Sequence, residues 1–343
     1  MQHTIHSTLT QDALRLTTAL ALDSSGARIE VQSLLQHVLK TSRAWLLAHP
    51  EHCLNNSAQA HYAALLQRRL CGEPIAYMLG EREFFGLMFK VTPDVLIPRP
   101  ETELLVELAL ERCGRVAAPP PGTHRPPSCG GIPSPSATLL PLPGKLPLLN
   151  PLPQAGEEAN EKGNSLILAG EGQGRGCAFR VLDLGTGSGA IALAIAHARP
   201  DSQVLACDAS SAALEVAREN AQLLGIANTT FVQSDWFSAL DAQRFDMIVS
   251  NPPYIAADDP HLQCGDVCFE PPSALASGDD GLHDIRHIIS QAKIHLDRGG
   301  WLLLEHGYDQ AAQARELLQQ NGFDEIFTAC DLAGIERVSG GRA

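Results

Sequence analysis

The second half of the chain alternates short apolar runs with helical stretches. The runs have the length of buried strands, and this order is typical of a parallel sheet covered by helices. The pattern therefore predicts a doubly wound, Rossmann-like α/β domain. The predicted strands are the run that begins at Arg180, the segments 203–207, 230–233, 245–250 and 301–305, and an edge pair at 326–329 and 336–339.

Helix signals separate these strands. An alanine-rich stretch at 190–198 follows the first strand after a run of glycines. Ser210 or Ser211 is placed to cap a later helix that runs to Leu224, where Gly225 ends it.

The first eighty residues have helical spacing instead. We predict a small helical domain over 1–82, with Ser57 capping one helix and Trp45 in the core. Such a domain serves as a partner-recognition module, or alternatively as an appendage with a packing role only. The apolar positions that carry the pattern are Leu35, Val38, Leu39, Trp45, Leu46, Tyr62, Leu65, Leu66 and Leu70.

Segment 83–98 is rich in aromatic and β-branched residues and predicts a β-hairpin linker with bends at Gly86 and Pro93. Prolines then stop the strand, and glutamates favour the start of a helix over 102–112. The α/β domain accordingly spans 99–343.

An insertion interrupts this domain at 117–177. The segment contains 12 of the 23 prolines, and leucine alternates with proline over 139–153. Such a composition suits neither a helix nor a central strand. We predict a disordered or polyproline-like surface loop that the fold tolerates, in preference to a proline-motif ligand.

Composition and charge narrow the function classes. The 343 residues suffice for two domains, and 44% hydrophobic and 19% charged residues are typical of a soluble globular protein. Neither a membrane span nor a secretory signal is indicated. Nine cysteines without a framework favour a reducing cytoplasm. The net charge of −14 disfavours direct nucleic-acid binding, and we expect a monomer without a membrane partner.

A glycine loop follows the first predicted strand. Its glycines allow positive φ and a close approach of the backbone to a ligand. The loop reads G-x-G-x-G, but it also matches the G-x-G-x-x-A spacing of a dinucleotide loop through Gly185, Gly187 and Ala190. Asp208 ends the next strand, where a ribose-binding acid belongs for both patterns. The loop residues are Gly185, Thr186, Gly187, Ser188 and Gly189.

Three strand ends favour S-adenosylmethionine over a nicotinamide cofactor. Asp183 precedes the glycines, where its carboxylate can face the amino end of a methionine moiety. Asp235 and Trp236 follow the third strand and offer an acceptor for an adenine amino group beside a ring on which adenine packs. The fourth strand ends in Asn251-Pro252-Pro253-Tyr254, which is the most specific of the three signals.

This last motif suits the methylation of a planar amide or aryl amine. The nitrogen lone pair of such a group is delocalised, so its NH2 must be held in line with the methyl donor. The Asn251 side-chain oxygen and the Pro252 carbonyl can accept the two N–H groups, and the prolines aim these acceptors rigidly. Tyr254 offers a flat face to the substrate. Alignment of this kind can supply roughly 7–11 kcal/mol of a barrier.

These motifs resemble those of the peptide chain release factor N5-glutamine methyltransferases (the PrmC/HemK family). The resemblance covers nearly all of the chain outside 117–177, where that family has a short connection. The segments that carry it, besides the glycine loop and Asn251 to Tyr254, are Glu73-Pro74-Ile75-Ala76-Tyr77, Arg82-Glu83-Phe84-Phe85-Gly86, Leu96-Ile97-Pro98-Arg99-Pro100-Glu101-Thr102-Glu103, Ser234-Asp235-Trp236-Phe237, Phe269-Glu270-Pro271 and Glu336-Arg337-Val338.

The resemblance implies methyl transfer from S-adenosylmethionine to the glutamine side-chain amide in the Gly-Gly-Gln motif of class 1 release factors. It implies that Gly185 to Gly189 cradle the methionine end, that Asp208 binds the ribose and that Trp236 lies on the adenine. It also implies that Asn251 to Tyr254 hold the glutamine amide, and that the helical domain recognises the release factor.

Other functions remain open. An adenine-N6 DNA or RNA methyltransferase uses the same Asn-Pro-Pro-aromatic device, but it needs a basic surface and a base flipped out of its stack. A protein that only binds would not need the glycine loop and the strand-end acids, and nicotinamide chemistry lacks a proton-relay pair.

The segment 255–284 is predicted to form a loop over the ligand pocket. Two ligand-like spacings occur in or just beyond it, but neither completes a zinc site, so we predict no metal. They are the set His261, Cys264 and Cys268 and the pair His283 and His287.

Overall fold

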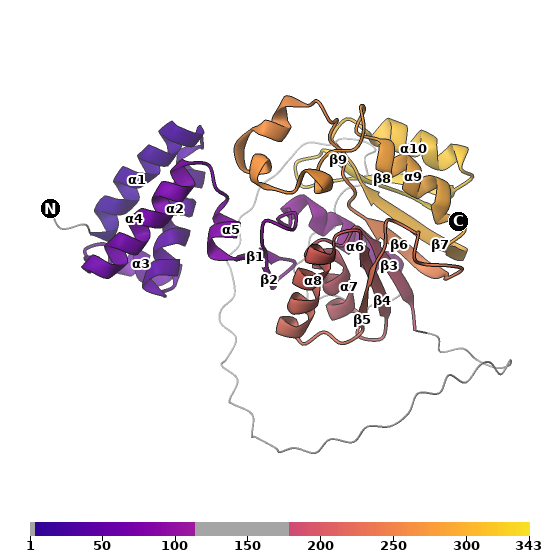
Figure 1. The fold of residues 1–343 in the computed structure, drawn as a ribbon, viewed down its shortest axis with the longest axis horizontal. Coiled ribbons are helices and arrows are strands. Elements are labelled where there is room, and N and C mark those ends of the chain that lie inside the picture. Colours follow the sequence, from indigo (N-terminus) through magenta and orange to yellow (C-terminus); the bar gives the residue numbers. More distant parts are fainter. Residues whose placement is uncertain (1–3, 114–177) are drawn as a thin grey trace, which may run out of the picture. The chain divides into compact units, whose positions relative to one another are not determined.

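The computed structural model describes residues 4–113 and 178–343 (Figure 1). The predicted insertion at 117–177 lies outside the described residues. The domain boundaries at 82 and 98 stay predictions. None of the described helices is both long enough and apolar enough to cross a membrane.

The described residues begin with a group of helices, as the sequence predicts. Apolar side chains from these helices form one core cluster, against which the half-buried Trp45 packs. The predicted cap Ser57 is wrong. The side chain of Asn55 accepts the Ala58 N–H instead, because the helix begins at Asn56. The helices are α1 (Ile5–Leu20), α2 (Ser24–Leu39), α3 (Arg43–Ala48), α4 (Asn56–Leu70) and α5 (Ile75–Leu79).

A two-stranded antiparallel hairpin follows, formed by β1 (Glu81–Phe84) and β2 (Leu87–Lys90). Phe85 and Gly86 both have positive φ, 51° and 75°, as in the tight turns that suit two-residue hairpin connections. The hairpin is shorter than the segment 83–98 that the sequence predicts, because the chain turns again at Pro93, which has no N–H for a strand.

The main sheet has the strand order β5-β4-β3-β6-β7-β9-β8. Strands β3 to β7 are parallel, and β9 pairs antiparallel with both β7 and β8. This confirms the predicted Rossmann-like sheet and its closing strand pair. The strands are β3 (Arg180–Leu184), β4 (Gln203–Asp208), β5 (Thr229–Gln233), β6 (Phe245–Ser250), β7 (Leu296–Glu305), β8 (Asp324–Cys330) and β9 (Glu336–Arg342).

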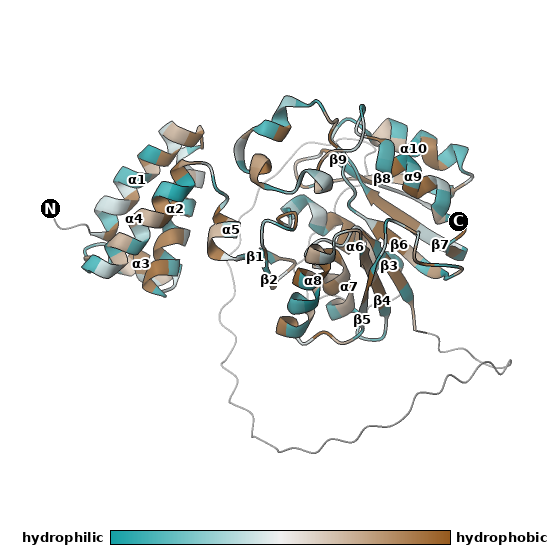
Figure 2. Ribbon diagram, viewed as in Figure 1, coloured by the Kyte–Doolittle hydropathy of each residue, from teal (hydrophilic) through white to brown (hydrophobic). Residues whose placement is uncertain are grey.

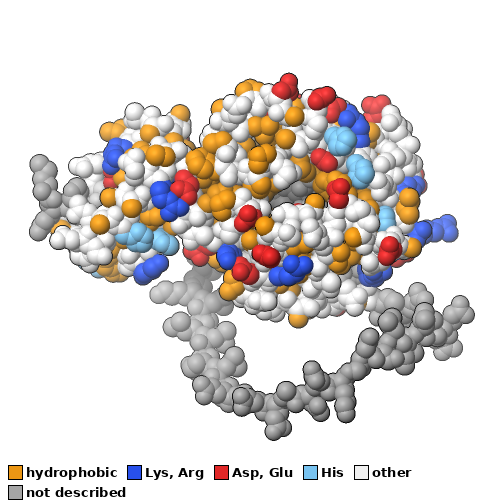
Figure 3. All heavy atoms as spheres, in the orientation of Figure 1, with side chains coloured by type: hydrophobic (Ala, Val, Ile, Leu, Met, Phe, Trp, Pro, Cys, Tyr) orange, Lys and Arg blue, Asp and Glu red, His pale blue; other side chains and the backbone are white. Residues whose placement is uncertain are grey.

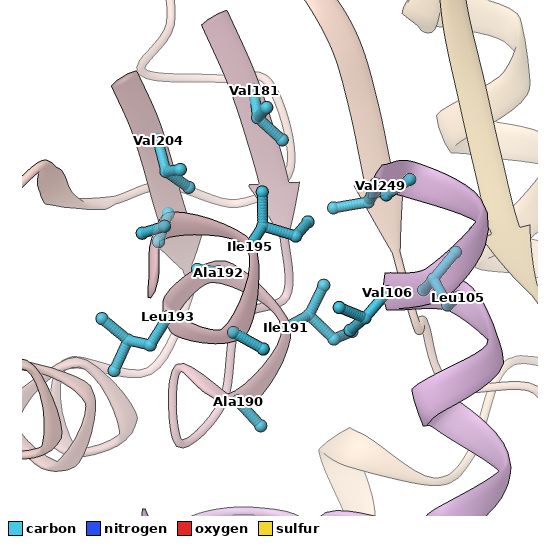
Figure 4. Close-up of a cluster of buried hydrophobic side chains, with 14 of the residues drawn as sticks. Leu105, Val106, Val181, Ala190, Ile191, Ala192, Leu193, Ile195, Val204 and Val249 are labelled. Carbon is cyan, nitrogen blue, oxygen red and sulfur yellow. The ribbon is translucent and has the colours of Figure 1, made fainter. Parts of the chain in front are cut away.

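Both faces of the sheet are buried. Val181 belongs to the core cluster that includes α6 and α7, and its neighbour Leu182 belongs to the cluster that includes α9. Figure 4 shows side chains of α7 between those of α6 and of the strands, and Figure 2 shows the central strands as mostly hydrophobic. The helices are α6 (Glu103–Arg112), α7 (Ala190–Ala198), α8 (Ser211–Leu224), α9 (His283–Ala292) and α10 (Ala311–Gln320).

The strand order places a crevice beside β3. From β3 the chain continues through β4 and β5 on one side, whereas β6 and β7 lie on the other side. In open α/β sheets, ligands bind outside the carboxyl ends of the strands at such a reversal. The site is therefore expected where β3, β4, β5 and β6 end.

Candidate active site at the carboxyl edge of the sheet

A cavity of about 400 Å³ lies at this edge. The segments that follow β3, β4, β5 and β6 contribute to its wall. The linker after the hairpin and the loop after β6 complete it. The residues that line it are Pro93, Asp94, Val95, Leu96, Gly185, Gly187, Asp208, Ala209, Ser210, Ala213, Ser234, Asp235, Trp236, Asn251, Pro253, Pro271, Ser273, Ala274 and Asp284.

The glycine loop needs its glycines for backbone reasons. The φ angles are 69° at Gly185, 54° at Gly187 and 83° at Gly189, a region that residues other than glycine rarely adopt. A Cβ atom on Gly185 would also lie 3.5 Å from the Trp236 ring. The loop therefore passes close beneath the ring on which the sequence predicts that adenine packs.

Asp183 lies beneath this loop and is completely buried. One carboxylate oxygen accepts the Thr186 hydroxyl at 2.7 Å and the Ala192 N–H at 3.2 Å. Burial raises the pKa of Asp183 to about 7. The carboxyl group thus holds the loop to the start of α7. The predicted contact of Asp183 with the amino end of a ligand stays a prediction.

Asp208, Asp235 and Trp236 line the same cavity, as the sequence predicts from their places at strand ends. The carboxylate of Asp208 accepts backbone N–H groups from Gly187 and Ser210, each at 2.9 Å. Burial nevertheless raises the pKa of Asp208. The acid is therefore fixed between the glycine loop and the start of α8. Thr186 and Ser188, the other two loop residues, are buried.

Asn251 stands where this cavity adjoins a second, smaller one of about 150 Å³. It lines both cavities, together with Leu96 and Ala274. Its side-chain Nδ2 donates to Thr102 Oγ1 at 3.2 Å. Pro252 is buried, and Pro253 lines the larger cavity. The other residues that line the smaller cavity are Arg99, Tyr254, Ile255, Val267 and Leu275.

The backbone carbonyl of Tyr254 is held by a hydrogen bond from Gln310. Its carbonyl oxygen accepts Gln310 Nε2 at 2.9 Å, and Gln310 Oε1 accepts the Gly307 N–H at 2.8 Å. A Cβ atom on Gly281 would lie only 2.4 Å from the same carbonyl oxygen. The last residue of the motif therefore depends on a glutamine and a glycine that sequence reasoning missed. Neither stands in a recognisable local pattern.

Asn220 is a second missed residue, and it does have a signal. It lies fully buried on the apolar face of α8. Its carboxamide accepts the Lys90 N–H at 2.7 Å and donates to the carbonyls of Lys90 and Ser188, both at 2.9 Å. One side chain thus ties the hairpin, the glycine loop and α8 together. A polar residue at an apolar position of a helix indicates such a role.

The predicted loop over the pocket is ordered by Glu270. This residue is 3% exposed, and its carboxylate accepts the Ile97 N–H at 3.1 Å and forms an ion pair with Arg99. Pro271, Ser273 and Ala274, which follow it, line the larger cavity. Within residues 4–113 and 178–343, no group of three His, Cys, Asp or Glu side chains is arranged to hold a metal ion.

Comparison with known proteins gives matches over almost the whole chain. A family model described as the methyltransferase small domain matches residues 165–274, and one described as the PrmC N-terminal domain matches residues 12–80. The release factor glutamine methyltransferase of Burkholderia pseudomallei (strain K96243) is 45% identical over 336 residues, which cover 96% of this chain and 95% of that protein.

Two further curated relatives carry the same name. The protein from Bordetella pertussis is 43% identical over 323 residues, with 94% of this chain and 97% of the relative covered. The protein from Salmonella typhimurium is 40% identical over 341 residues, with 99% and 98% covered.

Proposed function

Because the chain belongs to the release factor glutamine methyltransferase family, we propose that it methylates the N5 side-chain amide of the glutamine in the Gly-Gly-Gln motif of class 1 release factors. The observation that carries the proposal is the position of Asn251. This residue lies on the wall shared by the two cavities. We assign the larger cavity to the methyl donor and the smaller one to the amide.

The residues of the larger cavity fit S-adenosylmethionine. Asp208, Asp235 and Trp236 all line this cavity. We propose that Asp208 accepts ribose hydroxyls, that Asp235 accepts an adenine amino group and that adenine packs on the Trp236 ring. The positive φ angles of the glycine loop bring backbone close to the cavity, without side chains that would fill it. When bound, S-adenosylmethionine supplies an electrophilic methyl group on its sulfonium.

The smaller cavity suits the acceptor amide. Asn251 Nδ2 is engaged by Thr102, which leaves the side-chain oxygen Oδ1 to accept one N–H of the substrate. The Pro252 carbonyl is proposed to accept the second N–H, and the Tyr254 ring to pack on the planar amide. Two acceptors draw the nitrogen out of conjugation and align it with the methyl group. The methylated nitrogen then loses its proton to water, so no strong base is required.

The proposal is tested by mass spectrometry of a class 1 release factor incubated with the enzyme and isotope-labelled S-adenosylmethionine. We expect the mass of one labelled methyl group to replace one hydrogen on the Gly-Gly-Gln glutamine. A release factor with that glutamine replaced by alanine is the matched control. Label at another residue, or no label at all, contradicts the proposal.

An adenine-N6 methyltransferase is the second candidate, because its substrate is also a conjugated amine. The net charge of −14 disfavours it. On the face of the described residues in Figure 3, Lys and Arg side chains are interspersed with Asp and Glu. Parallel reactions with DNA and RNA distinguish the two functions, since methylated adenine without methylated glutamine would favour the second.

A further inference from the structure

Ser234 joins the end of β4 to the turn that carries Trp236. Its backbone N–H donates to the Asp208 carbonyl at 3.0 Å. Its hydroxyl donates to the Trp236 carbonyl at 2.7 Å and accepts the Ala239 N–H at 3.0 Å. Ser234 is 4% exposed and lines the larger cavity itself. One serine therefore connects the residue proposed for the ribose with the residue proposed for the adenine.

The directions of both hydroxyl bonds are fixed by chemistry. A carbonyl oxygen can only accept and a backbone N–H can only donate, so the single Ser234 hydroxyl proton points to Trp236. The Ser238 hydroxyl lies 3.5 Å from the Ser234 hydroxyl, at the limit of a hydrogen bond. The Cys207 thiol also faces the Trp236 carbonyl, at 3.6 Å, but a thiol is a weak donor. Ser234 is therefore the stronger of these two partners of the carbonyl.

Trp236 needs such support because its backbone is unusual. Its φ is 48°, in the left-handed region that residues with large side chains rarely adopt. The residue occupies the second position of a turn, which the Ser238 N–H closes by donating to the Asp235 carbonyl at 3.0 Å. Conformations of this kind persist where neighbouring contacts hold them, and they gather at ligand sites. The hydrogen bond from Ser234 to the Trp236 carbonyl is such a contact.

The same conformation sets where the indole ring lies. A Cβ atom on Gly185 would be 3.5 Å from ring atom Cζ3 of Trp236, so the ring lies close to the glycine loop. Trp236 also packs against the core cluster that contains Phe237, and it lines the larger cavity. Because φ sets the direction of the Cα–Cβ bond relative to the chain, a change to negative φ would turn the ring away from this place.

We propose that Ser234 is a positioning residue of the donor site, which holds the Trp236 backbone in its left-handed conformation and thereby directs the indole ring to the adenine of S-adenosylmethionine. The role of the ring as an adenine surface rests on the proposed function. The position of the ring does not, because it follows from the contacts among Ser234, Trp236 and Gly185.

The binding test compares Ser234→Ala with Ser202→Ala. Ser202 is a matched control just before the start of β4, at the opposite end from Asp208. It is 2% exposed, and its hydroxyl donates to the Arg199 carbonyl at 2.7 Å. Isothermal titration with S-adenosylhomocysteine, the product of the donor, should give a Kd about ten-fold higher for Ser234→Ala, because a displaced ring stacks less well on a base.

Ser202→Ala should lower the melting temperature comparably and keep this Kd within about two-fold of the parent, since it loses a similar hydrogen bond away from the cavity. An unchanged Kd in Ser234→Ala, or equal losses of affinity in both variants, overturns the proposal. Ser234→Cys, with a weaker donor of similar shape, replaces the alanine variant if that protein does not fold.

A double-mutant cycle shows whether Ser234 acts through Trp236. Trp236→Ala removes the ring, so adding Ser234→Ala should change the Kd for S-adenosylhomocysteine by no more than about two-fold. Independent losses that multiply would overturn the proposal. With saturating S-adenosylmethionine, kcat of Ser234→Ala should stay within about two-fold of the parent, while KM for this donor rises. A loss confined to kcat would also contradict the proposal.

A readout without ligand separates this proposal from the proposed function. The three tryptophans are Trp45, Trp236 and Trp301. In the full-length protein containing 5-fluorotryptophan, the Trp236 fluorine signal is identified by its loss in Trp236→Phe. We expect this signal to shift in Ser234→Ala and to keep its position in Ser202→Ala. An unmoved signal in Ser234→Ala overturns the proposal. A protein that shows the shift but binds no S-adenosylhomocysteine contradicts only the proposed function.

Discussion

At the scale of single residues, Asn251 has the most specific proposed task, since the cavities proposed for the methyl donor and for the acceptor amide both include it in their lining. Replacement by alanine removes one of the two acceptors proposed for the substrate amide and leaves the glycine loop, Asp208 and Trp236 in place. We expect Asn251→Ala to slow methyl transfer at least about 10²-fold, which corresponds to about 2.7 kcal/mol.

Isothermal titration should find S-adenosylmethionine binding to this variant almost as tightly as to the parent. A rate close to that of the parent enzyme would remove the assignment of Asn251. Loss of cofactor binding would instead place the residue in the donor site.

Gly281 controls the other end of the same motif. A Cβ atom there would lie 2.4 Å from the Tyr254 carbonyl oxygen, and its φ of +72° is unfavourable for alanine. Gly80 is a matched control, because its φ is +76° and a Cβ atom on it would meet no atom within 4 Å. Gly281→Ala should therefore lower kcat about ten-fold or more by displacing Tyr254. Gly80→Ala should cost only the backbone strain, about 1–3 kcal/mol, with normal kcat.

Thermal unfolding and steady-state kinetics of the two alanine variants check this comparison. Equal kinetic effects in both variants would show that backbone strain, rather than contact with Tyr254, is responsible.

Residues differ in how far the sequence alone predicts them. Asp208, Asp235 and Asn251 lie at or just after the ends of strands, so their common edge is predictable once the strands are recognised. Thr102 and Gln310 come from distant segments, and only the folded chain brings them to Asn251 and Tyr254. No local sequence pattern predicts these long-range contacts.

At the scale of elements, α8 is attached to the site through Asn220. Its carboxamide makes three hydrogen bonds, which reach the hairpin and the glycine loop. Asn220→Ala should leave buried backbone groups without hydrogen-bond partners. The group that is most costly to leave unpaired should lower the free energy of unfolding by about 1–3 kcal/mol. The loop should also lose its support, so the affinity for S-adenosylmethionine should fall about ten-fold.

Asn228 is a control for this prediction. Its Nδ2 donates to the carbonyls of Ala196, Arg199 and Ser202, away from the glycine loop. Asn228→Ala should reduce the free energy of unfolding comparably while cofactor affinity is unchanged. Denaturant unfolding and calorimetric titration measure both quantities. Equal losses of affinity would argue against a direct role of Asn220 in the loop.

A pH-sensitive group directly follows β7 and contacts β9. His306 is fully buried, and its ring nitrogens hydrogen-bond with Gly307 O and Ser339 Oγ, both at 2.9 Å. Burial lowers its pKa. The charged groups near it are Glu336, which raises the pKa, and Arg315 and Arg337, which lower it.

The unfolded chain therefore binds a proton at this residue at a higher pH than the folded chain does. The free energy of unfolding should fall as the pH decreases below about 6.5, the unfolded pKa, until the folded pKa is reached. His306→Gln should make this fall less steep. Urea unfolding at several pH values measures the difference, and identical slopes in the parent and the variant would contradict the assignment.

Element boundaries show what local sequence cannot determine. The helix over 190–198 and the glycine that ends α8 were predictable, since an alanine-rich run and a terminal glycine are local signals. The start of β7 at Leu296 was not, because Asp297 to Gly300 has the composition of a turn. That stretch stays in the strand through its neighbours, as Leu296 pairs with Phe245 of β6.

At the scale of the whole molecule, the family relationship spans both the helices and the sheet, whereas segment 117–177 has a composition of its own. The last described helix before it, α6, ends at Arg112, and β3 begins at Arg180. Replacing 117–177 with a short connection should preserve both folding and methyl transfer, because a segment with the predicted character of a surface loop contributes little to a core.

The melting temperature, the affinity for S-adenosylmethionine and the rate of glutamine methylation should then match those of the parent. Failure to bind the cofactor would assign the insertion a role in the donor site. Normal cofactor binding with lost methylation would instead assign it to the recognition of the release factor.

The adjoining cavities have a consequence for inhibition. The wall between the two cavities includes Leu96, Asn251 and Ala274, which line both of them. Under the proposed assignment of the two cavities, a bisubstrate compound, in which an adenosyl group is joined through a short chain to a carboxamide, would occupy both cavities at once. Its affinity would exceed that of either fragment, because binding of one end raises the effective concentration of the other end. A linker one carbon shorter would lose most of this gain, because it could no longer span the two cavities.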